Sequence, residues 1–164
     1  MTKKMLLVLF LLLSAALPAR ALCVLPLCTC TLTTANVAFG SYNPMSFSPT
    51  DSTGSVSVSC GGVAGLLIPM TVAISTGSSG SYGTRKLRSG ANTLDYNLYT
   101  DASYTTILGD GSGATQLANL SLLLDVLGLA PAQTVWVYGR IPARQLAAVP
   151  GVYADTINVT LTYY

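Results

Sequence analysis

The chain has 164 residues, with 8 Lys and Arg, 6 Asp and Glu and no His, so its formal net charge is +2 at pH 7. The absence of His excludes Ser–His and Cys–His catalytic pairs. Three of the cations lie within residues 1–20, and the remainder carries five cations against six aspartates, a net charge of −1. This balance argues against nucleic acid as a partner, because nucleic-acid binding needs a concentrated basic surface.

The N-terminus has the three parts of a secretory signal peptide. Residues 1–4 contain two lysines, residues 5–13 are an unbroken apolar run, and residues 19–21 have the small-x-small pattern of a cleavage site. An apolar run this short cannot span a bilayer, which needs roughly 20 residues. We therefore predict that residues 1–21 are removed on export and that residues 22–164 form one mature domain without a membrane span.

Cysteines in an exported protein are read first as disulfides. Cys28 and Cys30 are expected to have different partners, because a Cys-x-Cys pair is difficult to bridge. Four cysteines allow three pairings, and composition does not choose among them. With no His in the chain and three of the four cysteines close together, we expect no metal site and no cofactor. The four are Cys23, Cys28, Cys30 and Cys60.

Alternation of apolar and polar residues recurs along the chain and predicts short β-strands. In the last predicted strand every second residue from Tyr153 to Tyr163 lies in phase. Residues 118–129 are rich in Leu, which permits a helix, but Gly128 and the flanking pattern favour a strand or hairpin. Apart from residues 118–129, the predicted strands cover, in chain order, residues 30–39, 55–60, 66–75, 93–100, 134–141 and 153–163.

Clusters of Gly, Pro, Ser, Asn and Asp separate these segments and predict turns. Six or seven short strands joined by such turns are typical of a β-sandwich or barrel. The sequence has no repeat and no linker, so we predict one all-β domain.

The sequence offers no arrangement of residues typical of an active site. The aspartates Asp95, Asp101, Asp110 and Asp155 stand beside turn residues or at strand edges, where Asp usually caps a turn or is solvated. The basic run 85–88 predicts a solvated loop, with a small anion-binding patch as the alternative. Tyrosines spaced along the predicted strands favour core or sheet-surface positions over a sugar site. We therefore predict a binding or structural protein and not an enzyme.

Several short motifs occur in a fixed order over nearly the whole mature chain. They lie at residues 30–44, 56–60, 85–87, 94–101, 109–111, 137–142 and 151–156. In this order they resemble the spore coat protein U domain family, which includes the pilins of archaic chaperone–usher pili.

The resemblance implies an incomplete immunoglobulin-like sandwich that lacks its last strand. It also implies a disulfide between Cys30 and Cys60, which ties the first strand to the second and leaves Cys23 and Cys28 as a second bridge. In such pili a periplasmic chaperone lends a strand to the unfinished sheet, and a neighbouring subunit replaces that strand at an outer-membrane usher. The expected partners are therefore the chaperone, the usher and neighbouring pilus subunits.

The expected strand-acceptor groove lies beside the final predicted strand. The apolar alternation there is compatible with a groove, although a paired strand of a finished domain would show the same pattern. Pro26 interrupts the short segment before the first strand, so we expect this chain to accept a strand and to donate one poorly. The residues expected at the groove are Val37 and Phe39 on one edge and Ile157, Val159, Leu161 and Tyr163 on the other.

The leading functional prediction is a structural or tip subunit of an extracellular chaperone–usher pilus, exported through the periplasm to the cell surface. Its expected roles are surface attachment and biofilm formation. One alternative is a stand-alone secreted coat or matrix protein. Another is a carbohydrate-binding β-sandwich that uses exposed tyrosines such as Tyr82 and Tyr104.

Overall fold

The computed structural model describes residues 28–62, 67–123 and 131–163. The predicted signal peptide and Cys23 lie outside the described residues. The elements are β1 (Cys28–Ala35), β2 (Thr50–Gly62), β3 (Leu67–Ile74), the 3-10 turn η1 (Gly77–Ser79), β4 (Arg85–Ser89), β5 (Asn92–Tyr99), β6 (Ile107–Leu108), β7 (Thr115–Gln116), β8 (Ala118–Leu123), β9 (Gln133–Ile141) and β10 (Val159–Tyr163).

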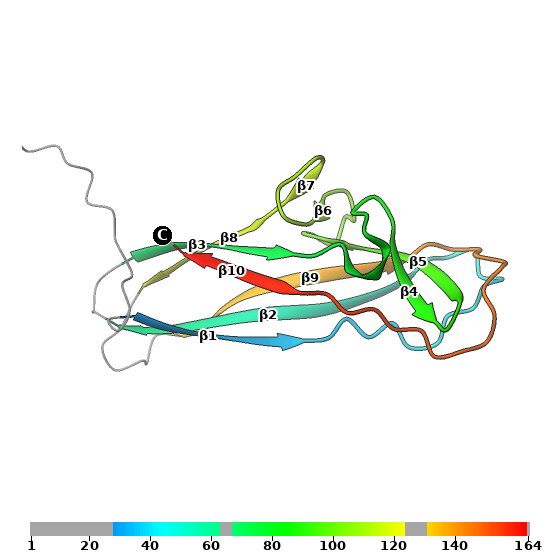
Figure 1. The fold of residues 1–164 in the computed structure, drawn as a ribbon, viewed down its shortest axis with the longest axis horizontal. Coiled ribbons are helices and arrows are strands. Elements are labelled where there is room, and N and C mark those ends of the chain that lie inside the picture. The colour runs from blue at the N-terminus through cyan, green and yellow to red at the C-terminus, as the bar shows by residue number, and fades with distance from the viewer. Residues whose placement is uncertain (1–27, 63–66, 124–130, 164) are drawn as a thin grey trace, which may run out of the picture.

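The strands form two sheets. The larger sheet has the order β1-β2-β9-β5-β6-β7, with β4 paired to β5, and the smaller has the order β10-β3-β8. Figure 1 shows the smaller sheet lying along one side of β1 and β2, with long strands in both layers. The predicted all-β, immunoglobulin-like sandwich is confirmed. Among the described residues, no helix has the length and apolar character needed to cross a membrane.

The core follows directly from the alternation in the sequence. In β2, Val56, Val58 and Cys60 are buried, while the serines between them are half-exposed on the outer face. The same alternation buries Ile68, Met70, Val72 and Ile74 in β3. Each fully buried aliphatic side chain contributes about 1.5–3 kcal/mol through apolar area removed from water. The inner faces of the two sheets therefore account for the packing of the sandwich.

A disulfide joins Cys30 of β1 to Cys60 of β2. The two residues are direct cross-strand partners, and their Cα atoms are 4.1 Å apart. This confirms the pairing that the family resemblance implies. Cys23 and the side chain of Cys28 lie outside the description, so the second bridge stays a prediction.

The first predicted strand ends earlier than expected. β1 stops at Ala35, and the partly buried positions change phase from Leu32 to Val37 and Phe39. A Cβ atom on Gly54 would lie 2.5 Å from the Ala35 carbonyl oxygen and 2.9 Å from the Val37 nitrogen. The chain therefore passes close over β2 at this glycine and leaves the pairing register, which makes the prediction of strand for residues 36–39 wrong.

The last predicted strand is also shorter than expected, since β10 covers only Val159–Tyr163. Residues 153–158 keep the predicted alternation of half-buried and exposed positions, but they pair only at an isolated bridge between Ala154 and Arg88. In the Leu-rich region, Ala118–Leu123 is the predicted strand, and residues 124–129 lie outside the description.

The prediction of a solvated loop at residues 85–88 is wrong, because this run is strand β4 and Arg85 is 0% exposed. Its guanidinium donates to the Ser75 carbonyl from Nε (3.2 Å) and Nη2 (3.0 Å), to the Leu108 carbonyl (2.9 Å) and to Asn97 Oδ1 (2.6 Å). Burial lowers the pKa of Arg85 from its ordinary value. These acceptors replace water around the buried guanidinium.

Candidate functional site

A groove of about 1320 Å³ runs between two segments. One segment follows β1, and the other leads into β10. The first wall is formed by residues 36–44, after β1, and the second wall by residues 148–159, up to the start of β10. Side chains of both sheets form its floor, and most of them are buried and apolar. The principal floor residues are Val56, Ile74, Leu94, Leu98, Val137 and Ile141.

The first wall lies over two glycines of the larger sheet. A Cβ atom on Gly139 would lie 2.5 Å from Val37 Cγ1 and 2.7 Å from Phe39 Cζ, so only glycine leaves room for these side chains. No backbone-to-backbone hydrogen bond joins residues 36–42 to another segment within the described ranges. The Ser52 hydroxyl donates to the Ala38 carbonyl at 2.7 Å. Side-chain packing therefore holds this wall in place.

The second wall is fixed along one side only. The amide of Ser75 donates to the Asn158 carbonyl at 3.0 Å, and Ala154 and Arg88 exchange two backbone hydrogen bonds of 3.0 and 2.8 Å. Successive residues of an extended chain direct their backbone groups to opposite sides. The N–H and C=O groups of Asp155 and Ile157 therefore face away from these partners, toward the groove.

Val159 shows the same arrangement at the start of β10. It stands opposite Ile74 in the β10–β3 register. The Ile74 amide donates instead to the Gly109 carbonyl at 3.2 Å, and the Ile74 carbonyl accepts from the Tyr82 hydroxyl at 3.0 Å. The backbone groups of Val159 are therefore not bonded to its opposite residue and point to the open edge of the strand.

Four of the six residues predicted at the groove line it together, namely Val37 and Phe39 on the first wall and Ile157 and Val159 on the second. The other two lie farther along β10, outside the groove lining. Leu161 packs against the core, and Tyr163 is 37% exposed.

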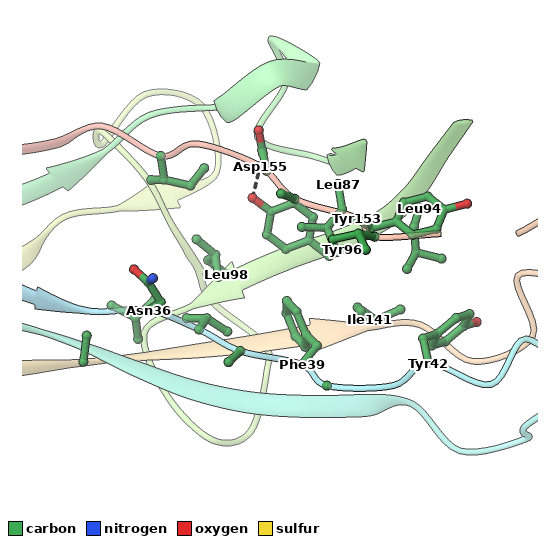
Figure 2. A pocket seen from close by; sticks show the side chains of 18 of the residues that line it. Asn36, Phe39, Tyr42, Leu87, Leu94, Tyr96, Leu98, Ile141, Tyr153 and Asp155 are labelled. Atoms are coloured by element: carbon green, nitrogen blue, oxygen red, sulfur yellow. Dashed lines mark hydrogen bonds between the residues drawn. The ribbon is translucent and has the colours of Figure 1, made fainter. Parts of the chain in front are cut away.

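Sequence reasoning missed two residues at the middle of the groove. Tyr96 Oη donates to Asp155 Oδ2 at 2.7 Å, and the Ser78 amide donates to Asp155 Oδ1 at 2.9 Å. Figure 2 shows Tyr96 below Asp155 with this hydrogen bond as a dashed line. Burial is the main cause that raises the pKa of Tyr96, so its hydroxyl stays protonated and remains a donor. Tyr96 is buried and Asp155 half-buried, each in an alternating segment, but alternation does not predict a contact between segments so far apart in the chain.

Tyr42 fixes the far end of the first wall. Its hydroxyl donates to the Pro142 carbonyl at 2.9 Å and accepts from the Gln145 amide at 2.9 Å. The Gln145 side chain in turn accepts from the Asp95 amide and donates to the Asp95 carbonyl, both at 2.8 Å. This network joins the wall to the loop after β9 and to β5.

The aspartates of the described part of the chain have separate hydrogen-bond partners. Asp101 and Asp110 accept from the amides of Ser103 and Ser112 at 2.8 and 2.9 Å, as predicted for turn residues. Asp155 instead belongs to the groove wall. Within the described ranges no cluster of three or more His, Cys, Asp or Glu is placed to hold a metal.

The two tyrosines considered for sugar binding each have a ring face in contact with an arginine. The Arg85 guanidinium lies 5.1 Å from the Tyr82 ring centroid, and that of Arg140 lies 3.6 Å from the Tyr104 centroid. Sugar rings stack on open aromatic faces, so these contacts disfavour the carbohydrate-binding alternative at Tyr82 and Tyr104.

Comparisons with known proteins agree with this architecture. One chain of the crystal structure described as the CsuC-CsuE chaperone-tip adhesion subunit pre-assembly complex from archaic chaperone-usher Csu pili of Acinetobacter baumannii aligns with a TM-score of 0.52 and 20% identity. The alignment covers 82% of the present chain and 39% of that chain, so this protein spans well under half of that neighbour. No curated protein matches. The Spore Coat Protein U domain matches residues 17–160, and the chain therefore belongs to this family.

Proposed function

We propose that the protein is a subunit of an extracellular chaperone–usher pilus and that its groove accepts a β-strand from a partner. The observation that carries the proposal is the open edge of the second wall, where the backbone groups of Val159 are not bonded to Ile74. Strand addition satisfies such groups through main-chain hydrogen bonds. The accepted strand places alternate side chains on the apolar floor of the groove.

The length of the second wall supports this mechanism. A strand rises about 3.3 Å per residue, so a wall of residues 148–159 matches a partner segment of roughly 10 residues. An apolar groove beside unpaired backbone is an aggregation hazard unless a partner covers it. A periplasmic chaperone would cover the groove before assembly, and a neighbouring subunit would cover it in the pilus after exchange at the outer-membrane usher.

The family membership and the fold shared with a Csu pilus assembly complex support the same proposal. On this proposal the protein is exported through the periplasm to the cell surface, where the pilus serves attachment and biofilm formation. The alternative of a stand-alone secreted coat or matrix protein requires no strand partner, so a direct binding experiment separates the two.

The test is periplasmic co-expression of the full chain with a candidate periplasmic chaperone of an archaic chaperone–usher system, followed by purification through a tag on the chaperone. We expect a one-to-one complex. Val159→Asp places a charge on the groove side of the wall and is expected to abolish co-purification, because a buried unpaired charge is costly. Thr160→Asp is the matched control, since Thr160 is exposed on the opposite side of the same strand.

Two results would contradict the proposal. One is a soluble, stable monomer that forms without any chaperone and does not bind the chaperone when the two are mixed. The other is equal loss of co-purification in the Val159 and Thr160 variants, which would indicate a general folding defect and not a groove effect.

A further inference from the structure

Three side chains from separate segments form a continuous line of contacts across the middle of the groove. Phe39 comes from the first wall, Tyr96 from β5 and Asp155 from the second wall. The Phe39 and Tyr96 ring centroids are 5.9 Å apart at an interplanar angle of 73°, and Tyr96 Oη donates to Asp155 Oδ2 at 2.7 Å. Figure 2 shows Tyr96 between the other two residues. We call this line Phe39–Tyr96–Asp155 the cross-groove contact.

Both ends of the cross-groove contact are attached to regular structure. At one end Phe39 packs over Gly139 of β9, where a Cβ atom would lie 2.7 Å from Phe39 Cζ. At the other end Asp155 Oδ1 accepts from the amide of Ser78 in η1, the turn that follows β3. The line therefore connects the larger sheet to the turn beside the smaller sheet, and it sets the distance between the two walls.

The walls depend on these side chains because their backbones are weakly held. Within the described ranges, residues 36–42 have no backbone-to-backbone hydrogen bond to another segment, and such bonds tie the second wall to distant segments only at Ala154 and Asn158. Water favours closure of an empty apolar groove, because closure removes apolar surface from solvent. A groove that closes must reopen before a strand enters, and this lowers the apparent affinity in proportion to the open fraction.

We propose that Phe39, Tyr96 and Asp155 are positioning residues that hold the walls of the groove apart before a strand arrives. The proposal rests on the proposed strand-accepting function. It assigns to the Tyr96 hydroxyl a role in keeping the empty groove open, beyond the packing of its ring. Preorganisation of this kind improves binding by reducing the ordering that the partner must otherwise impose.

The test removes the central hydrogen bond and nothing else. Tyr96→Phe deletes the hydroxyl and keeps the ring that contacts Phe39. The probe is a synthetic peptide of roughly 12 residues that alternates Val and Thr, with its dissociation constant for the full chain measured by fluorescence anisotropy. Because the acceptor is a carboxylate, we expect Tyr96→Phe to weaken binding by about tenfold or more.

Tyr138→Phe is the matched control. Tyr138 lies on β9, outside the groove lining, and its ring contacts that of Tyr104 at a centroid distance of 6.5 Å. This variant removes a phenol hydroxyl that does not reach the groove, so its affinity is expected to stay within about twofold of the parent chain, the scale of a substitution at an uncoupled site. Equal affinities for the parent and the Tyr96 variant, or equal losses in both variants, would overturn the proposal.

A second readout does not require strand capture. The Ser78 amide reports directly on Asp155, and hydrogen exchange at this amide in the isolated full chain is expected to accelerate by about tenfold in Tyr96→Phe and to be unchanged in Tyr138→Phe. If the parent chain fails to bind the peptide, the strand-accepting function fails, while faster exchange at Ser78 still supports the positioning role.

Unchanged exchange at Ser78 in Tyr96→Phe overturns the positioning role, whatever the result of the binding assay. Asp155→Asn covers the case in which Tyr96→Phe does not fold, because the amide oxygen can still accept from Ser78 while the charged acceptor for Tyr96 is lost. For this variant we expect weaker peptide binding and faster Ser78 exchange, each smaller than in Tyr96→Phe. Parent-like values in both measurements would contradict the proposal.

Discussion

Arg85 shows how one buried polar residue organises the fold around the groove. Its guanidinium is fully buried and bonds carbonyls of Ser75 and Leu108 and the side chain of Asn97. Ser75 directly follows β3, Leu108 lies in β6 and Asn97 lies in β5. A planar fork of donors reaches all of them at once, and an ammonium does not.

We therefore predict that Arg85→Lys destabilises the protein by about 2–4 kcal/mol, because buried acceptors lose their donors. Urea unfolding followed by circular dichroism measures the change. Arg88→Lys is the control, since Arg88 is exposed and its side chain donates one 3.2 Å hydrogen bond to the Ser78 carbonyl. Equal stability of the Arg85 variant and the parent would show that the network contributes nothing.

The Asp51–Arg140 pair gives a prediction for pH. Arg140 Nε and Nη2 donate to the two Asp51 carboxylate oxygens at 2.7 and 2.8 Å. The hydrogen bond from Arg140 is the main cause that lowers the pKa of Asp51 below its ordinary value. A lowered folded-state pKa contributes stability above the unfolded value, and this contribution is lost as the pH falls through the folded value.

The side chain of Asp51 is 37% exposed, so solvent screens the ion pair. The pair therefore contributes less than about 1 kcal/mol to the free energy of unfolding. We predict that Asp51→Asn lowers the melting temperature slightly at about pH 6 and that the difference from the parent disappears toward about pH 2. Calorimetry over this range measures it. A difference that persists unchanged in acid would show that the pair does not act through its charge.

At the scale of elements, the first wall is held in place by the glycine beneath it. A Cβ atom on Gly139 would lie 2.5 Å from Val37 Cγ1 and 2.7 Å from Phe39 Cζ. We predict that Gly139→Ala displaces the wall and costs about 1–3 kcal/mol, the usual range for overpacking. Thermal unfolding tests this against Gly61→Ala, where an added Cβ meets nothing within 4 Å. A Gly139 variant as stable as the Gly61 variant would contradict the packing argument.

The sequence predicted regular strands well where side-chain alternation coincides with backbone pairing. In β2, β3, β5 and β9 the buried apolar side chains recur at every second residue, because each strand has one face on the core, although Asn97 of β5 is buried as well. Alternation alone does not report pairing, so residues 36–39 and 153–158 were predicted as strand although the backbone there is mostly unpaired.

Arg85 and Asp155 show why part of the site was not predictable. A charged residue in a short basic run favours a solvated loop. Only the distant acceptors Ser75, Asn97 and Leu108 show that the buried guanidinium keeps its hydrogen bonds. The contact of Tyr96 with Asp155 joins residues 59 positions apart. Local pattern carries no information on contacts of this range.

At the scale of the whole molecule, the two walls distinguish an isolated chain from one with an accepted strand. We predict that the amides of Ile157 and Val159 exchange rapidly in the isolated chain and become protected in the complex with the chaperone, because the new strand bonds to them. The Ala154 amide is the internal control, since it already donates to the Arg88 carbonyl at 3.0 Å. If the Val159 amide exchanges as rapidly in the complex as in the isolated chain, while the Ala154 amide stays protected in both, the partner binds elsewhere.

The change of phase after β1 has a consequence for which sequence lengths the fold tolerates. The segment after β1 is pinned at Cys30 by the disulfide and at Tyr42 by its hydrogen bonds to the loop after β9. Deletion or insertion of one residue between these points would turn Val37 and Phe39 outward, since side chains alternate with period two. Related chains should therefore conserve the spacing from Cys30 to Tyr42, whereas insertions should collect in the exposed loop that follows, at residues 43–49.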